Sequence, residues 1–114
     1  MHEACIILPV EDNNGLSLAS EHKALGRALL EKFGGYSRSE CVGSWLDPKT
    51  NVVHDDKSYM YTVAMSPTPK NDKALFSIAS STAASCGQEA IYVRDAWGCV
   101  HIIHPVNNKA KLAA

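Results

Sequence analysis

The chain has 114 residues, of which 46% are hydrophobic and 20% charged, and its formal net charge is −1 with the histidines neutral. This balance is typical of one globular domain, which we expect over residues 1–110. The 11 Lys and Arg and 12 Asp and Glu are scattered along the chain, a pattern that argues against duplex nucleic acid as a partner.

No apolar run approaches the roughly 20 residues of a membrane span, and the N-terminal residues lack the features of a secretory leader. We therefore expect a cytoplasmic protein that does not bind membranes. The four Cys are far apart, form no C-x-x-C motif, and three lie in apolar runs. We expect four free thiols, no zinc site and no cofactor. Residues 111–114 are expected to be a vector-derived tail.

The first half of the chain predicts a strand, a helix and a hairpin. Residues 4–10 form an apolar run that ends in a polar turn at residues 11–15. Apolar positions then recur at helical spacing from residue 17 to Gly34 and Gly35. Residues 39–46 and 57–65 alternate as two strands, with turn residues at 47–51 and an extension at 52–54.

The second half predicts a helix followed by two strands. Asn71 or Asp72 is expected to cap the helix, which ends at Gly87. Residues 88–93 are expected to form strand four, and residues 99–103 a short fifth strand before Pro105. The order is that of an α+β, ferredoxin-like βαββαβ two-layer sandwich with an extra C-terminal strand.

Residues 43–45, the turn after them, residues 58–63 and residues 88–93 resemble small bacterial and phage proteins of unknown function that have ferredoxin-like folds. The resemblance covers residues 24–103. It implies the same fold and brings no catalytic assignment with it.

Aromatic side chains on the predicted hairpin are the first candidate binding residues. Trp45, Tyr59 and Tyr61 could form a platform on one face of the sheet, for a nucleobase or a partner side chain, or could pack in the core. The second candidates are Gln88 and Glu89 at the start of strand four. We expect Gln88 on the open face and Glu89 at the rim of the core, either solvated or in a cleft beside the first helix.

Metal and nucleophile chemistry find little support in the sequence. His101 and His104 lie three residues apart, so on a strand they point to opposite faces. The loop at residues 11–15 lacks the final carboxylate of an EF-hand, because Lys23 stands in its place. General acid–base work by Glu89, His22, His54 or the two tyrosines stays open.

Three functions remain after these exclusions. The first is a non-enzymatic binding or regulatory module that acts through its open sheet face, as an accessory protein of a phage or mobile element. A sheet with one bare face also predicts a homodimer, or contact with another protein or a small molecule. The alternatives are a dimeric α/β-barrel enzyme for a small apolar substrate and a nucleotide-binding protein.

Overall fold

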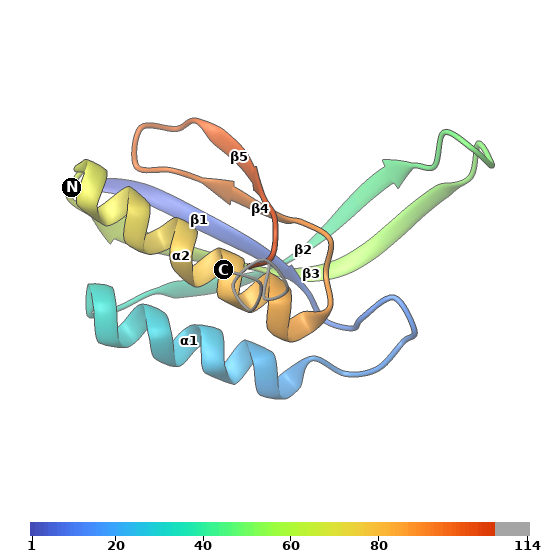
Figure 1. The fold of residues 1–114 in the computed structure, drawn as a ribbon, viewed down its shortest axis with the longest axis horizontal. Helices are drawn as coiled ribbons and strands as arrows, with labels where there is room; N and C mark the ends of the chain where they lie inside the picture. The colour runs from blue at the N-terminus through green and yellow to red at the C-terminus, as the bar shows by residue number, and fades with distance from the viewer. Residues whose placement is uncertain (107–114) are drawn as a thin grey trace, which may run out of the picture.

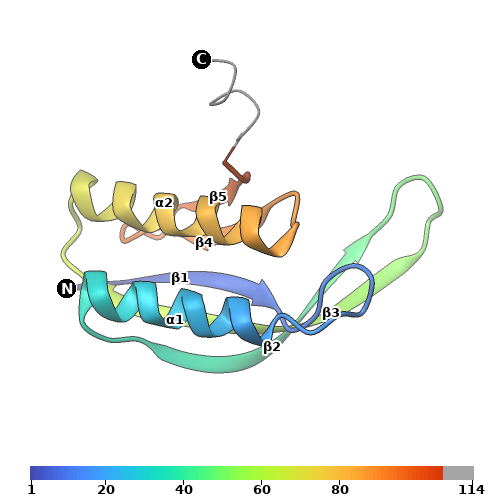
Figure 2. The same cartoon turned by 60° about the horizontal axis from the view of Figure 1, so that its bottom comes forward.

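The computed structural model describes residues 1–106, which form one antiparallel sheet and two helices. The elements are β1 (His2–Pro9), α1 (Ala19–Phe33), β2 (Ser37–Leu46), β3 (Val53–Met65), α2 (Pro69–Cys86), β4 (Ile91–Arg94) and β5 (Val100–Ile103). The sheet order is β2-β3-β1-β4-β5, and both helices cover the same face (Figures 1 and 2). The predicted α+β, ferredoxin-like sandwich with an extra strand is confirmed. The predicted tail at residues 111–114 lies outside the described residues.

The core lies between the helices and the central strand β1. Ile6 of β1 lies opposite Tyr61 on β3 and Val93 on β4, and all three side chains are fully buried. Leu25 and Leu75 contribute from the two helices. Neither described helix is long and apolar enough to cross a bilayer.

Helix α2 begins earlier than the sequence suggested. Pro69 is its first residue, and the Thr68 hydroxyl accepts a hydrogen bond from the N–H of Asn71 at 3.2 Å. The prediction that Asn71 or Asp72 is the cap is wrong. Proline suits the first helical position because its φ is already helical and that position needs no N–H donor.

The segment before β4 is a second correction. Gly87 ends α2 with a left-handed φ of 65°, and the N–H of Gln88 still bonds to the carbonyl of Ala83 at 3.0 Å. The chain is therefore still closing the helix at Gln88, and β4 begins only at Ile91. The prediction that Gln88 and Glu89 open strand four is wrong.

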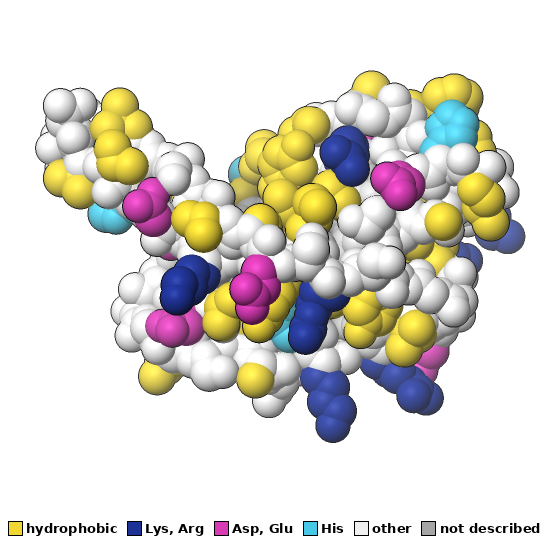
Figure 3. Space-filling view, turned by 180° about the vertical axis from the view of Figure 1, so that it is seen from behind, with side chains coloured by type: hydrophobic (Ala, Val, Ile, Leu, Met, Phe, Trp, Pro, Cys, Tyr) yellow, Lys and Arg dark blue, Asp and Glu magenta, His cyan; other side chains and the backbone are white. Residues whose placement is uncertain are grey.

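Part of the β2–β3 hairpin extends beyond the helices as an arm, residues 42–57 (Figures 2 and 3). Every residue of the arm is exposed except Asp47, which is half-buried. Trp45 stacks on His54 with ring centroids 4.5 Å apart, and its Nε1 donates to Asp56 at 3.2 Å. The arm thus contains cross-strand contacts, and no second layer from residues 1–106 packs on it.

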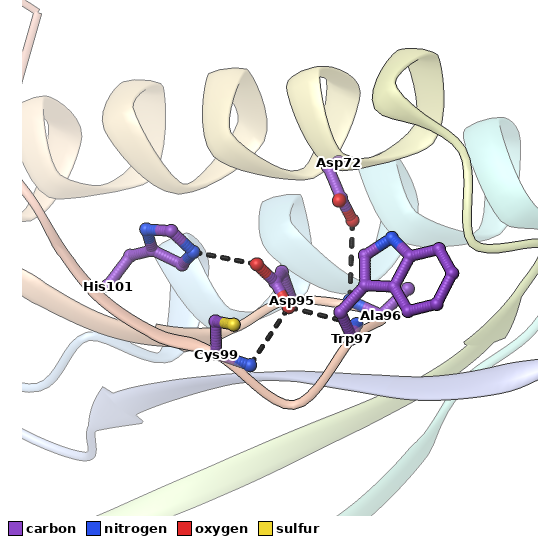
Figure 4. Close-up of polar contacts among 6 residues, drawn as sticks. All are labelled: Asp72, Asp95, Ala96, Trp97, Cys99 and His101. Atoms are coloured by element: carbon purple, nitrogen blue, oxygen red, sulfur yellow. Dashed lines mark hydrogen bonds and ion pairs between the residues drawn. The ribbon is translucent and has the colours of Figure 1, made fainter.

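Two carboxylates bind the turn between β4 and β5: Asp72 of α2 accepts from the N–H of Ala96 at 3.3 Å, and Asp95 makes the other contacts (Figure 4). Asp95 Oδ1 accepts from the N–H groups of Trp97 and Cys99 at 2.9 and 3.0 Å, while Oδ2 lies 2.8 Å from His101 Nε2. Burial disfavours the charged form of Asp95, yet these hydrogen bonds outweigh it and lower its pKa. The charged Asp95 carboxylate therefore binds the turn before β5 and His101 within β5.

Candidate functional site

A groove of about 790 Å³ runs between α1 and the neighbouring strands β2 and β3. Its size is within the range of about 300 to 1,000 Å³ that is usual for small-molecule sites. Its lining includes the basic residues Lys23, Arg27 and Arg38, the aromatic residues His22, Tyr36 and Tyr59, and two serines, Ser17 and Ser20.

The turn after α1 brings Tyr36 back against the helix. Gly34 ends α1 with a left-handed φ of 86°, and the chain reverses before β2. A Cβ atom at Gly26 would lie 2.5 Å from the Tyr36 hydroxyl oxygen, well inside van der Waals contact. Gly26 therefore allows the Tyr36 ring to form the end wall of the groove.

A buried polar pair supports the floor of the groove. His22 Nε2 lies 2.7 Å from the carbonyl oxygen of Pro9, and Nδ1 lies 2.7 Å from the hydroxyl of Tyr61. Since a carbonyl only accepts, Nε2 carries the proton, and neutral Nδ1 accepts from Tyr61. Both ring nitrogens are thus occupied, and the pair ties α1 to β1 and β3.

Burial shifts the titration of both members of this pair. It lowers the pKa of His22, although the hydrogen bond to Pro9 acts in the opposite direction. It raises the pKa of Tyr61, and nearby Arg38 offsets part of the rise. Both groups are consequently held in their neutral forms near pH 7.

The charged residues of the groove are cationic. The Arg38 guanidinium lies 4.3 Å from the centre of the Tyr59 ring, a cation–π contact. Lys23 and Arg27 add two more cations along α1, and Arg27 is paired with exposed Glu31 at 2.8 Å. The groove can therefore attract an anionic group such as a carboxylate or phosphate.

A second hollow of about 380 Å³ meets this groove at Val10 and Tyr59, which line both. Its lining includes Glu40 and Lys57. Glu40 lies directly opposite Tyr59 in the β2–β3 ladder. A ligand that reaches past Tyr59 would thus leave a groove whose charged lining residues are cationic and enter a hollow that contains both the Glu40 carboxylate and the Lys57 ammonium group.

The three aromatics predicted as a platform are not together. Tyr61 is fully buried, and Tyr59 faces the same helix-covered side, where its ring meets that of His22 edge-on at 5.2 Å. Trp45 is 51% exposed on the arm. The platform alternative is wrong for the two tyrosines, because alternate residues of β3 place both side chains under α1. The other alternative, packing in the core, is confirmed for Tyr61.

Gln88 and Glu89 lie away from the groove, in the loop that leads to β4. Glu89 is exposed, and its carbonyl oxygen lies 3.0 Å from His104 Nδ1. The structure brings the other named candidates together only in part: His22 and the two tyrosines meet at α1, whereas His54 lies on the arm. No cluster of three or more metal-ligating side chains occurs within residues 1–106.

Sequence reasoning did not name Arg38, Tyr36 or Glu40. The positions of Arg38 and Glu40 follow from the pairing of the two hairpin strands. If Arg38 lies opposite Tyr61, then Glu40 lies opposite Tyr59. The register itself depends on the turn at residues 47–52, where Asn51 has a φ of 58°. The place of Tyr36 in the groove could not be predicted from the sequence, because it depends on the contact of its ring with Gly26.

No family model matches this chain, and no curated protein matches it. Its fold is similar to that of a phage SAM lyase in complex with S-methyl-5'-thioadenosine. That likeness has a TM-score of 0.67 and 12% identity, over 90% of this chain and 88% of the other. The apo state of a phage SAM lyase matches with a TM-score of 0.62 and 13% identity, over 90% and 87%. At such identities the likeness concerns the fold.

Proposed function

We propose that this protein binds an adenosyl compound of the S-adenosylmethionine class in the groove beside α1. The observation that carries the proposal is that a cationic groove and a hollow containing Glu40 meet at one aromatic residue, Tyr59. Such a ligand combines an aromatic base, a carboxylate and cationic groups. Each part has a matching partner in these two hollows.

The aromatic wall suits the base, since Tyr36 offers a ring surface beside an apolar stretch that includes Leu30. The planar guanidinium of Arg38, which lies over the Tyr59 ring, offers a second flat surface. Lys23 and Arg38 suit the carboxylate, and Glu40 suits the cationic end. The likeness in fold to a phage protein that holds S-methyl-5'-thioadenosine supports the same class of ligand. A role in a phage or mobile element remains part of the proposal.

This proposal moves the binding function away from the open sheet face that the sequence favoured. That face carries an apolar row in which Ile7 lies opposite Tyr92, and Tyr92 opposite Ile102. The groove offers hydrogen-bonding, cationic and aromatic groups at once, and specific small-molecule sites need that mixture.

Calorimetry with S-adenosylmethionine, S-methyl-5'-thioadenosine and AMP tests the proposal. We expect Tyr59→Leu to weaken binding of the preferred adenosyl compound about tenfold or more, a loss of about 1.4 kcal/mol. Tyr92→Leu is the matched control, because Tyr92 lies on the opposite face of the sheet, and it should bind like the parent. Absence of binding of all three compounds to the parent at millimolar concentration would reject the proposal.

A second candidate is turnover of the bound compound, and Glu40 favours it. Glu40 is the one carboxylate among the residues that line the two hollows, and a positioned carboxylate is a common general base. In this step the bond between the sulfonium sulfur and the aminobutyrate chain would break, the sulfur would keep the bonding pair, and Glu40 would take a proton from that chain. Chromatography of S-adenosylmethionine incubated with the protein would then reveal S-methyl-5'-thioadenosine and an unsaturated four-carbon amino acid in equal amounts. Turnover by the parent, lost in Glu40→Gln while binding persists, would support the enzyme; no product from the parent would leave a binding protein.

A further inference from the structure

The two edges of the sheet differ in how they are protected. The β5 edge is four residues long and is followed closely by Pro105. The β2 edge is ten residues long and contains no proline, and nine of its ten residues are exposed. A long, exposed edge strand presents unpaired backbone groups to another strand.

The charged residues of β2 can form ion pairs with those of β2 in a second copy of the chain. Arg38 and Glu40 are two residues apart, so they lie on the same face of the strand with Ser39 between them. If two copies of β2 pair antiparallel about a two-fold axis through Ser39, Arg38 of each copy lies opposite the partner's Glu40. Two reciprocal ion pairs result, as a symmetric interface requires.

The same register also fixes where the start of the arm would lie. Val42 would lie opposite the partner's Tyr36, and the arm would continue past the partner's Gly34 and Gly35. Neither glycine has an atom within 4 Å of the position that a Cβ would take. At these two positions the partner therefore has neither a side chain nor a neighbouring atom in the place of a Cβ.

We propose that this chain forms a homodimer by pairing its β2 edges about Ser39, which joins the two sheets into one. The partner's Glu40 then stands beside Arg38, so that each ligand groove receives a charged group from the other copy. The contact differs from the dimer across the open face that the sequence suggested. The strand pairing itself requires no ligand, whereas the place of the partner's Glu40 in the groove rests on the proposed function.

Cysteine cross-linking in a Cys99→Ser background tests the register, since Cys99 is an exposed thiol. Ser39→Cys should give a disulfide-linked dimer on oxidation, because the two introduced thiols meet on the axis within the Cα range of about 4.4 to 6.8 Å. Ser37→Cys should link to the partner's Cys41. Ser77→Cys, exposed on α2, is the control and should stay monomeric on denaturing gels. Equal cross-linking of all three would overturn the register.

Charge exchange tests the ion pairs independently of cross-linking. Arg38→Glu and Glu40→Arg should each weaken dimerisation about tenfold in sedimentation experiments, and the double exchange should restore it. Tyr59→Leu should remain dimeric, so loss of ligand binding and loss of the dimer are distinguishable. A parent protein that is monomeric at tens of micromolar, or a double exchange no better than the single ones, would overturn the proposal.

Discussion

The two halves of the β2–β3 hairpin have the same strand pairing and opposite environments. Near its start the hairpin lies under α1, where Tyr61 and Val63 are fully buried. On the arm, Val42 and Val53 are each 63% exposed although they belong to the same ladder. The difference shows that an apolar residue in a strand is buried only where a second layer covers it. The arm holds its shape by cross-strand contacts, and the body by its packed core.

The largest expected difference in the free energy of unfolding is between two Leu→Ala substitutions, one in the packed body and one on the arm. Leu8→Ala removes a fully buried side chain from β1 and should lower the free energy of unfolding by about 2 to 5 kcal/mol. Leu46→Ala, at a 55% exposed position on the arm, should change it by less than about 0.5 kcal/mol. Urea denaturation measures both. Equal losses would mean that the arm is packed as tightly as the body.

Removal of one carboxylate from the body and of one from the arm should give a smaller difference in the free energy of unfolding. Asp95→Ala removes the acceptor for two backbone N–H groups and the partner of His101. We expect a loss of about 1 to 3 kcal/mol and faster amide exchange in β5. Asp55→Ala removes an exposed acceptor of Ser44 on the arm and should cost little. If Asp55→Ala proved the more damaging, the arm would depend on polar contacts that the body does not need.

Removal of one hydroxyl group from the body and of one from the arm tests the same difference in stability. Tyr61→Phe leaves Nδ1 of buried His22 without its donor, and should cost about 1 to 2 kcal/mol. Ser44→Ala deletes an exposed hydroxyl on the arm and should be close to neutral. Thermal unfolding of both variants, compared with the parent, measures the difference. An unchanged Tm for Tyr61→Phe would show that His22 finds another partner.

The pH dependence of stability should show the smallest difference. The pKa of His22 is lowered in the folded state, mainly by burial, so below the ordinary value near 6.5 the unfolded chain binds more protons than the folded one. Stability should therefore fall as the pH is lowered from 7 through 6.5 and below. His22→Gln should flatten this decline in urea titrations at several pH values. His54→Gln, on the exposed arm, should leave the slope unchanged.

The fold was predictable because its strongest signals are local. Gly34 and Gly87 end the two helices where expected, both with positive φ, and the alternation of Ile91 and Val93 gives the buried face of β4. The turn after α2 was missed because a glycine cap engages the next residue, Gln88, before the strand begins. Local pattern shows where a helix stops, but not how many residues its cap uses.

The candidate site was less accessible to sequence reasoning because it depends on which face of the sheet the helices cover. Tyr59 and Tyr61 were identified, but their burial under α1 follows from tertiary packing. His22 was named as a possible acid or base, and its bond to Tyr61 could not be predicted because it joins residues 39 positions apart. The arm could not be foreseen either, since its length relative to the helices is a property of the assembled layers.

The position of β1 has a consequence for synthesis of the chain. This strand is central in the sheet, and Ile6 finds its neighbours only when Tyr61 and Val93 are available. The strand β1 is therefore synthesised before both of the strands that pair with it, and only the synthesis of β4 completes the pairing of its two edges. Until then the strand that contains Cys5, Ile6, Ile7 and Leu8 has an unpaired, apolar edge. A chain that ends before β4 would expose this edge and should aggregate.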